Sequence, residues 1–201
     1  PKTTLKLIKG HKEQNIFDVN GTGFELMTNL DTGKFVEFAD QPPYSIRFGD
    51  VRITTEMAQL QCSRILNQIK LNFGWAEIVI ENHRISLSSN YSVSIAKGNL
   101  LYIPVYAFTD SAQKSRINIM NEKGLDPETL AAFIVNSTEL DALSLLYLLT
   151  KTTTANREMI VSKLESFFPA ITDEVKQGLI NEKPDSLEYV RGFLKWILLF
   201  Q

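Results

Sequence analysis

The stretch DPETLAAFIVNSTELDALSLLYLLT, residues 126–150, decides the fold class of the second half of the chain. Asp126 is a residue that caps helices, and Pro127 suits the first helical position. Glu128 adds a negative charge at the positive end of the helix dipole. These three start signals in a row predict a helix over 127–135.

The helical pattern continues from this stretch to the end of the chain. Cap residues, proline breaks and apolar positions three or four residues apart predict helices over 138–150, 154–168, 173–181 and 186–200. The first of these is apolar nearly all round, which is typical of a central helix. Asp185 and Glu188 are spaced as a capping box. Residues 125–201 are therefore predicted to form an all-helical subdomain of about five helices.

Towards the N-terminus the pattern changes to short apolar runs separated by turn residues. Glycine and proline in these turns are typical of a β-meander. One helix is predicted near 54–72, since Thr54 or Thr55 can cap it and apolar residues from Met57 to Ile69 gather toward one side. Strands are predicted to resume at Trp75 and to continue through the run 100–108 and, less regularly, 116–120.

The sequence thus predicts an α+β protein. Residues 1–122 form a mostly antiparallel β-sheet with one inserted helix, and residues 125–201 form the helical subdomain. The pattern does not decide whether residues 121–124 between them are a domain boundary or a loop.

Charge and cysteine content limit the function classes. The formal net charge is -2, so no global field draws the chain to nucleic acid or to an anionic membrane. The single cysteine, Cys62, excludes an internal disulfide and is typical of a reducing compartment, so a cytoplasmic location is predicted.

Three motifs imitate catalytic sites. Asp31-Thr32-Gly33 resembles the active-site triplet of aspartic proteases, but the chain has no second such triplet, and the same residues form hairpin turns. Gly21-Thr22-Gly23 lacks the third glycine and the following helix of a dinucleotide fingerprint. Cys62 with His11 or His83 is interpreted as a buried small hydrophobe rather than a nucleophile with its base.

We therefore predict no catalytic residue, no metal site and no cofactor. The acidic residues lack the spacing that aims several ligands at one metal ion. The protein is predicted not to be an enzyme. The enzyme alternative, with a site assembled from scattered residues, would draw on Asp31, Asp50, Cys62, His83 and Arg84.

A nucleic-acid-binding module is an alternative function. Residues 51–125 contain eight basic and five acidic residues, and aromatic side chains that could stack on bases lie between them. The candidate RNA-binding residues are Arg52, Arg64, Lys70, Arg84, Lys114 and Arg116. No RNP-type motif accompanies them.

The C-terminal segment, residues 187–200, is unusually apolar. It is too short and too charged to span a bilayer, which leaves three interpretations: packing in its own core, contact with a protein partner, or shallow insertion at a membrane surface. The candidate interface residues are Tyr189, Phe193, Trp196, Ile197 and Phe200.

The predicted function is that of a non-enzymatic binding or assembly protein that acts through protein–protein contacts, either with copies of itself as a homo-oligomer or with a partner. The ending Leu198-Leu199-Phe200-Gln201 resembles the residues left upstream of a cut by a viral 3C-type cysteine protease. That resemblance covers four residues and adds a viral structural or accessory protein to the hypotheses.

Overall fold

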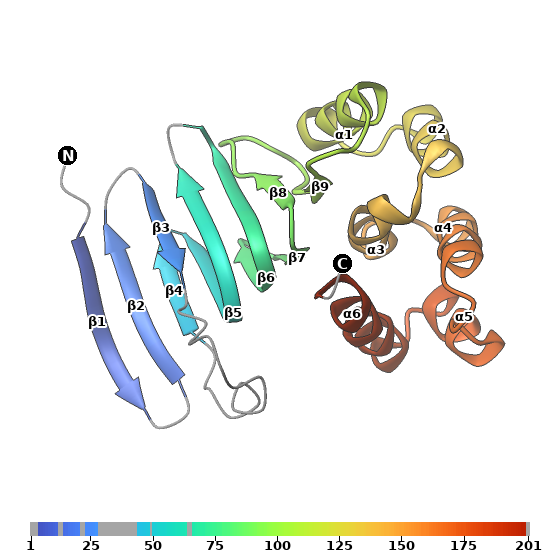
Figure 1. The fold of residues 1–201 in the computed structure, drawn as a ribbon. Coiled ribbons are helices and arrows are strands. Elements are labelled where there is room, and N and C mark those ends of the chain that lie inside the picture. The colour runs from blue at the N-terminus through green and yellow to red at the C-terminus, as the bar shows by residue number, and fades with distance from the viewer. Residues whose placement is uncertain are drawn as a thin grey trace. The chain divides into compact units, whose positions relative to one another are not determined.

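The computed structural model describes residues 4–11, 14–20, 23–27, 44–48, 50–63 and 66–199. The chain divides into two compact units, Pro1–Ala96 and Lys97–Gln201, which are described separately below (Figure 1). The predicted boundary near residues 122–125 falls between two helices of the second unit. The division into residues 1–122 and 125–201 stays a prediction.

The described elements confirm an α+β protein with a mostly antiparallel sheet and a helical C-terminal part. In the first unit the strands are β1 (Thr4–His11), β2 (Gln14–Asn20), β3 (Gly23–Met27), β4 (Tyr44–Phe48), β5 (Val51–Ser63), β6 (Gln68–Ile80), β7 (His83–Ser88) and β8 (Tyr91–Ser94). In the second unit the elements are β9 (Val105–Tyr106), α1 (Ser111–Lys123), α2 (Pro127–Asn136), the 3₁₀ turn η2 (Glu139–Asp141), α3 (Ala142–Leu149), α4 (Thr154–Phe167), α5 (Asp173–Ile180) and α6 (Pro184–Leu199).

The two long strands β5 and β6 organise the sheet. They pair with each other over their whole length, and each also pairs with two shorter strands, β5 with β4 and β3, and β6 with β7 and β8 (Figure 1). The pairs are antiparallel except β2 with β4, which continues the sheet toward β1. The fully buried apolar residues of this unit come from the central strands: Ile53, Leu60, Ile69, Leu71, Ala76, Ile78, Ile85, Leu87 and Val93.

The predicted helix near 54–72 is wrong, because this segment forms most of β5 and the start of β6. The pairing register shifts between Thr55 and Ala58, so the buried residues of β5 move from odd to even positions. Ile53 and Thr55 are buried before the shift, and Ala58, Leu60 and Cys62 after it. A period of two with such a phase change resembles the three-to-four spacing of a helix, which explains the error.

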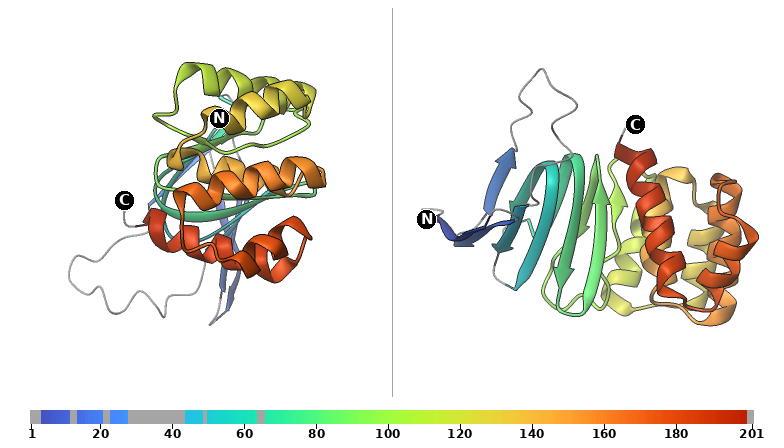
Figure 2. Two further views of the ribbon diagram at one scale, coloured as in Figure 1. Left: turned by 90° about the vertical axis from the view of Figure 1, so that its right-hand side faces the viewer. Right: turned by 90° about the horizontal axis from the view of Figure 1, so that it is seen from below.

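The second unit is a two-layer array of three helix pairs. α1 packs on α2, α3 on α4 and α5 on α6, and the left view of Figure 2 shows the pairs stacked in that order. One layer contains α1, α3 and α6, and the other contains α2, α4 and α5 (Figure 1). Every residue of α3 is buried, so the prediction that this helix is central is confirmed.

The helices predicted over 127–135, 154–168, 173–181 and 186–200 agree with the structure to within two residues at each end. The helix predicted over 138–150 is divided, because residues 139–141 form the 3₁₀ turn η2 and α3 begins at Ala142. Asp126 accepts a hydrogen bond from the Thr129 N–H, as expected of a cap, and Thr172 caps α5 in the same way. The predicted capping role of Asp185 is wrong, because α6 already begins at Pro184 and Asp185 lies in its first turn.

The strand predicted over 100–108 is limited to β9 in the structure, and the strand predicted over 116–120 is wrong. Within the run 100–108, β9 is the one described strand, because side chains of α1 and α3 take the backbone groups that a sheet would use. Asn121 accepts from the Ile103 N–H at 2.9 Å, and Tyr147 accepts from the Tyr102 N–H at 3.0 Å. Residues 116–120 lie inside α1, whose cap Asp110 accepts from the Gln113 N–H.

Gly178 sets the close approach of α5 to α6. A Cβ atom at Gly178 would lie 1.9 Å from Oγ and 2.8 Å from Cβ of Ser186. Gly192, in the middle of α6, is exposed, and a Cβ atom at this position would meet nothing within 4 Å. The two helical glycines therefore have opposite structural roles.

We expect Gly178→Ala to lower the free energy of unfolding by about 1–3 kcal/mol, because α5 and α6 must separate to admit the methyl group. The matched control Gly192→Ala should raise it by about 0.5–1 kcal/mol, since the methyl group meets nothing and alanine favours a helix. Urea denaturation followed by circular dichroism measures both. Equal effects of the two substitutions would contradict this role of Gly178.

Candidate functional site

α6 has a buried face and an aromatic exposed face. Val190, Leu194 and Leu198, spaced four residues apart, are buried. Tyr189 and Trp196 are seven residues apart, close to two full turns, so they share the opposite face, where they are 51% and 73% exposed. An exposed tryptophan on a well-packed helix is unusual, because burying this side chain is strongly favourable.

The other predicted interface residues differ in their environments. Phe193 is half-buried, and its ring packs edge-on against Phe168 at 5.8 Å between centroids, so it helps to anchor α6. Ile197 is also half-buried. Phe200 lies outside the described residues. Tyr189 and Trp196 are thus the two exposed members of the predicted set within the described part of the chain.

The sheet places three arginines in one row across four strands. Arg47 on β4 opposes Arg52 on β5, which opposes Val79 on β6, which in turn opposes Arg84 on β7. Directly opposed residues project from the same face of a sheet. All three arginines are exposed, and Val79 between them is 38% exposed. We call these four residues the arginine row.

The electrostatics of the arginine row are uneven. Within the described residues neither Arg47 nor Arg52 forms an ion pair, although like charges placed directly opposite each other repel. Arg84 donates from Nε to Glu77 Oε2 at 3.1 Å. The row is therefore least neutralised at its Arg47–Arg52 end.

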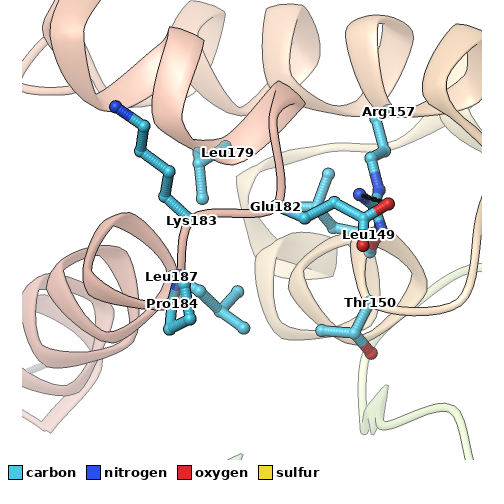
Figure 3. Close-up of a pocket in the computed structure, with 8 residues that line it drawn as sticks. All are labelled: Leu149, Thr150, Arg157, Leu179, Glu182, Lys183, Pro184 and Leu187. Atoms are coloured by element: carbon cyan, nitrogen blue, oxygen red, sulfur yellow. Dashed lines mark hydrogen bonds and ion pairs between the residues drawn. The ribbon is translucent and has the colours of Figure 1, made fainter.

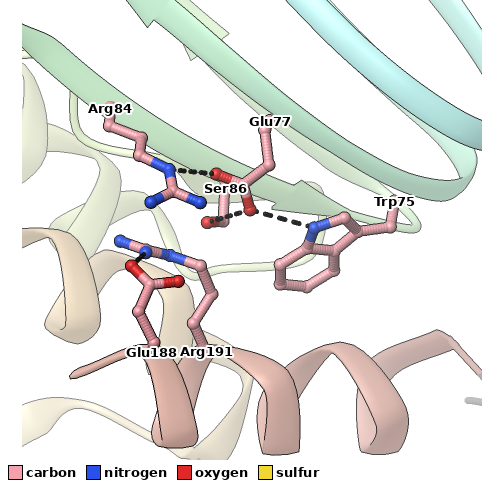
Figure 4. Close-up of polar contacts among 6 residues, drawn as sticks. All are labelled: Trp75, Glu77, Arg84, Ser86, Glu188 and Arg191. Carbon is pink, nitrogen blue, oxygen red and sulfur yellow. Dashed lines mark hydrogen bonds and ion pairs between the residues drawn. The ribbon is translucent and has the colours of Figure 1, made fainter. Parts of the chain in front are cut away.

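Glu77 is the centre of a polar network on β6 and β7. Its Oε1 accepts from Trp75 Nε1 at 3.0 Å and from Ser86 Oγ at 2.8 Å, while Oε2 accepts from Arg84 (Figure 4). Both carboxylate oxygens thus have donors within the sheet. This network holds Arg84 in place and leaves Glu77 committed to a structural role. Figure 4 also shows a separate ion pair within α6, between Glu188 and Arg191.

The other predicted nucleic-acid-binding residues are not part of the arginine row: Arg64, Lys70, Lys114 and Arg116. Lys70 is half-buried at the far end of β6, and Arg64 lies outside the described residues. Lys114 and Arg116 belong to α1 of the second unit, where Lys114 donates to the Ala107 carbonyl and Arg116 to Gln113 Oε1.

The residues considered for catalysis are dispersed. Cys62 is 3% exposed on β5, and burial raises the pKa of its thiol far above the usual range. His83 begins β7, and Asp50 is exposed in the turn before β5. The triplet at 31–33 and the 21–22 part of the Gly21 motif lie outside the described residues, as does the side chain of His11.

The described residues contain neither a cluster of metal ligands nor a membrane-spanning helix. No group of three or more histidine, cysteine, aspartate or glutamate side chains among them could hold a metal ion. None of the described helices is long and apolar enough to cross a membrane. The predicted cytoplasmic location stays a prediction.

The helical unit contains a cavity of about 200 Å³ that sequence analysis did not predict (Figure 3). It is formed by the end of α3, the first turn of α4, the end of α5 and the turn that leads into α6. Its lining residues are Leu149, Thr150, Arg157, Leu179, Glu182, Lys183, Pro184 and Leu187. The walls are mostly apolar, and the Lys183 ammonium group points away from the other lining side chains (Figure 3).

Arg157 is the buried charge of this cavity. Its side chain is 9% exposed, and its Nε donates to the Leu149 carbonyl at 3.2 Å, which satisfies one of the free carbonyls at the end of α3. Its Nη1 forms an ion pair with Glu182 but has no hydrogen bond of regular geometry. Glu182, by contrast, is a 68% exposed side chain.

Glu182 is held in an unusual backbone conformation. Its φ is 60°, in the left-handed region that favours glycine. The N–H groups of Lys183 and Glu182 donate to the carbonyls of Gly178 and Leu179, which is the Schellman pattern at the end of α5. Glu182 occupies the position where glycine is usual, and its carboxylate reaches Arg157 from there.

Sequence reasoning missed Arg47, Arg157 and Glu182. Arg47 joins the row through strand register, which the sequence does not give. Arg157 and Glu182 meet because α4 packs beside the α5–α6 turn. A weak signal existed for Glu182, because the helix ends there without the glycine expected after it.

Comparisons with known proteins give little information about this chain. No family model and no curated protein matches it. Two crystal structures from Parabacteroides distasonis, each described as a "putative anti-sigma factor", are similar in part. One, at 2.50 Å resolution, is 11% identical with a TM-score of 0.34, covering 58% of this chain and 61% of its own. The other, at 1.65 Å, is 12% identical with a TM-score of 0.37, covering 69% of each chain.

The chain therefore spans about three fifths of the first of these structures. With TM-scores of 0.34 and 0.37, the similarity supports no argument about function.

We expect Cys62 to be unreactive in the folded protein, because the thiol is buried and its raised pKa leaves almost no thiolate. Ellman's reagent should label the urea-unfolded chain fully, while the native chain stays unlabelled over the same period. Rapid labelling of the native chain would instead support the nucleophile interpretation of Cys62.

Proposed function

We propose that this protein is a non-enzymatic binding protein that docks on a protein partner through the exposed face of α6. The observation that supports the proposal is the 73% exposure of Trp196 on a helix whose opposite face is packed in the core. Tryptophan and tyrosine are the residues that most often dominate the energy of protein interfaces. Such a helix suits an apolar groove on the partner.

The charges near this face favour a protein over a membrane surface. Asp185 is exposed in the first turn of α6. Glu188 is exposed but forms an ion pair with Arg191, which is buried, and Lys195 is half-buried. Helices that lie on anionic membranes have lysine and arginine on their exposed side. We therefore expect a partner with an apolar groove whose rim is positively charged.

Photo-cross-linking at Trp196 tests this proposal. A photoreactive phenylalanine analogue replaces Trp196 in one variant and Val135, which is 66% exposed on α2, in the control. In the cells that naturally make the chain, we expect discrete protein adducts from position 196 and not from position 135. Adducts that contain two copies of the chain would identify self-association, and adducts with another protein would identify the partner.

A stability measurement accompanies the cross-linking. Because Trp196 is exposed, Trp196→Ser should change the free energy of unfolding by less than about 0.5 kcal/mol. Absence of adducts at position 196 beyond those at 135, with both variants folded, would contradict docking through α6.

The arginine row supports nucleic-acid binding as a second candidate function. Arg47 and Arg52 lie on adjacent strands, and Arg84 lies two strands further, so the row spans about 14 Å at the usual strand spacing of about 4.8 Å. A chain of phosphates would relieve the repulsion between Arg47 and Arg52. Val79 offers an apolar surface between the cations.

The salt dependence of RNA binding tests this second function. If a fluorescent single-stranded RNA binds, the slope of log K against log[salt] should become shallower by about 0.7 for each arginine removed in Arg47→Ala and Arg52→Ala. The control Lys97→Ala, exposed in the second unit, should leave the slope unchanged. The arginine row would be excluded as an RNA site if the protein did not bind RNA even at low salt. It would also be excluded if Arg47→Ala, Arg52→Ala and the control Lys97→Ala weakened binding equally.

A further inference from the structure

The cavity of the helical unit contains an unequal ion pair. Removing a charged group from water costs several kcal/mol in real proteins, so a buried arginine needs an anion beside it. Arg157 is buried, but its anion, Glu182, is mostly exposed. Glu182 can therefore return to water at little cost, while Arg157 cannot. The arginine is the fixed half of the pair, and its carboxylate partner is exchangeable.

The backbone at Glu182 does not depend on the contact with Arg157. The Glu182 and Lys183 N–H groups hold the left-handed turn by donating to the carbonyls of Leu179 and Gly178, so the Glu182 carboxylate can leave Arg157 without a change of backbone conformation. The contact with Arg157 Nη1 also lacks hydrogen-bond alignment. An incoming carboxylate that approaches Nη1 in line would make a better-aligned charge-assisted bond than Glu182 does.

The rest of the cavity indicates what kind of group is attached to this carboxylate. Leu149, Leu179, Pro184 and Leu187 supply apolar walls. Thr150 also lines the cavity, but its hydroxyl group already donates to the Tyr147 carbonyl at 2.7 Å, so Arg157 is the donor for the ligand. The volume of about 200 Å³ is below the range of roughly 300–1,000 Å³ that drug-sized ligands occupy. A short hydrocarbon chain fits such walls, because removing its methylene groups from water is favourable.

We propose that this cavity binds a small aliphatic carboxylate. The carboxylate replaces that of Glu182 beside Arg157, and the hydrocarbon chain lies against the leucine walls. Glu182 is then the competing internal anion that sets the affinity. This site is independent of the α6 face and of the arginine row, because none of the lining residues belongs to either.

Nuclear magnetic resonance titration of the full chain with hexanoate, hexan-1-ol and hexylamine tests the proposal. Hexanoate should shift the amide signals of Thr150, Leu179 and Leu187 in a saturable way. The alcohol should act more weakly, and the amine should not act at these residues, because Arg157 repels it. Equal shifts with all three compounds, or no shift at the lining residues with hexanoate, would overturn the proposal.

Two charge-removing variants make the test specific. Glu182→Gln removes the competing carboxylate and keeps the side-chain shape, so hexanoate should bind about fivefold tighter, which corresponds to about 1 kcal/mol. Glu158→Gln removes an exposed acid that follows Arg157 in sequence but does not line the cavity, and should leave the affinity unchanged. Weaker or unchanged binding to Glu182→Gln would show that Glu182 does not compete for Arg157.

Discussion

The phase change in the long β5–β6 pair is the constraint on which the sheet depends. Two regular 13-residue strands would present one continuous inner face and one continuous edge each. The register shift after Thr55 instead turns the inner face from odd to even residues, and each strand then pairs with one neighbour before the shift and another after it. Bulges of this kind bend a strand and increase its twist. The buried hydrogen bond from Thr55 Oγ1 to the Trp75 carbonyl, at 2.8 Å, fixes the bend from inside.

The helices from Pro127 onward were predicted well because their signals are local, whereas α1 was missed. Asp126, Pro127 and Thr172 mark helix starts by chemistry that acts within one turn, so no knowledge of the rest of the fold is needed. The helix wrongly expected near 54–72 failed for the opposite reason. Its apolar spacing results from a bulge, which depends on partner strands far along the chain. The run 100–108 failed similarly, because Asn121 and Tyr147 satisfy its backbone from other elements.

The candidate sites divide along the same line. Tyr189 and Trp196 could be selected from the sequence because helical periodicity alone places them on one face. Arg52 and Arg84 were selected from the sequence for their charge. That they lie in one row with Arg47 follows from the pairing register of the strands, which the sequence does not give. Arg157 and Glu182 lie 25 residues apart and meet through packing of α4 beside the α5–α6 turn, so the cavity could be found only from the structure.

Each of these sites also breaks a local rule of protein structure. Trp196 is an aromatic residue left in water, Arg47 and Arg52 are like charges placed opposite each other, and Glu182 occupies a position suited to glycine. Such exceptions lower stability unless something offsets them, and in natural proteins they gather where function requires them. The ion pair with Arg157 offsets the strain at Glu182 only in part, since the carboxylate is mostly in water. In our interpretation, an occupant would reduce this cost at Trp196 and at the Arg47–Arg52 pair, whereas at the cavity an incoming anion would displace the Glu182 carboxylate from Arg157.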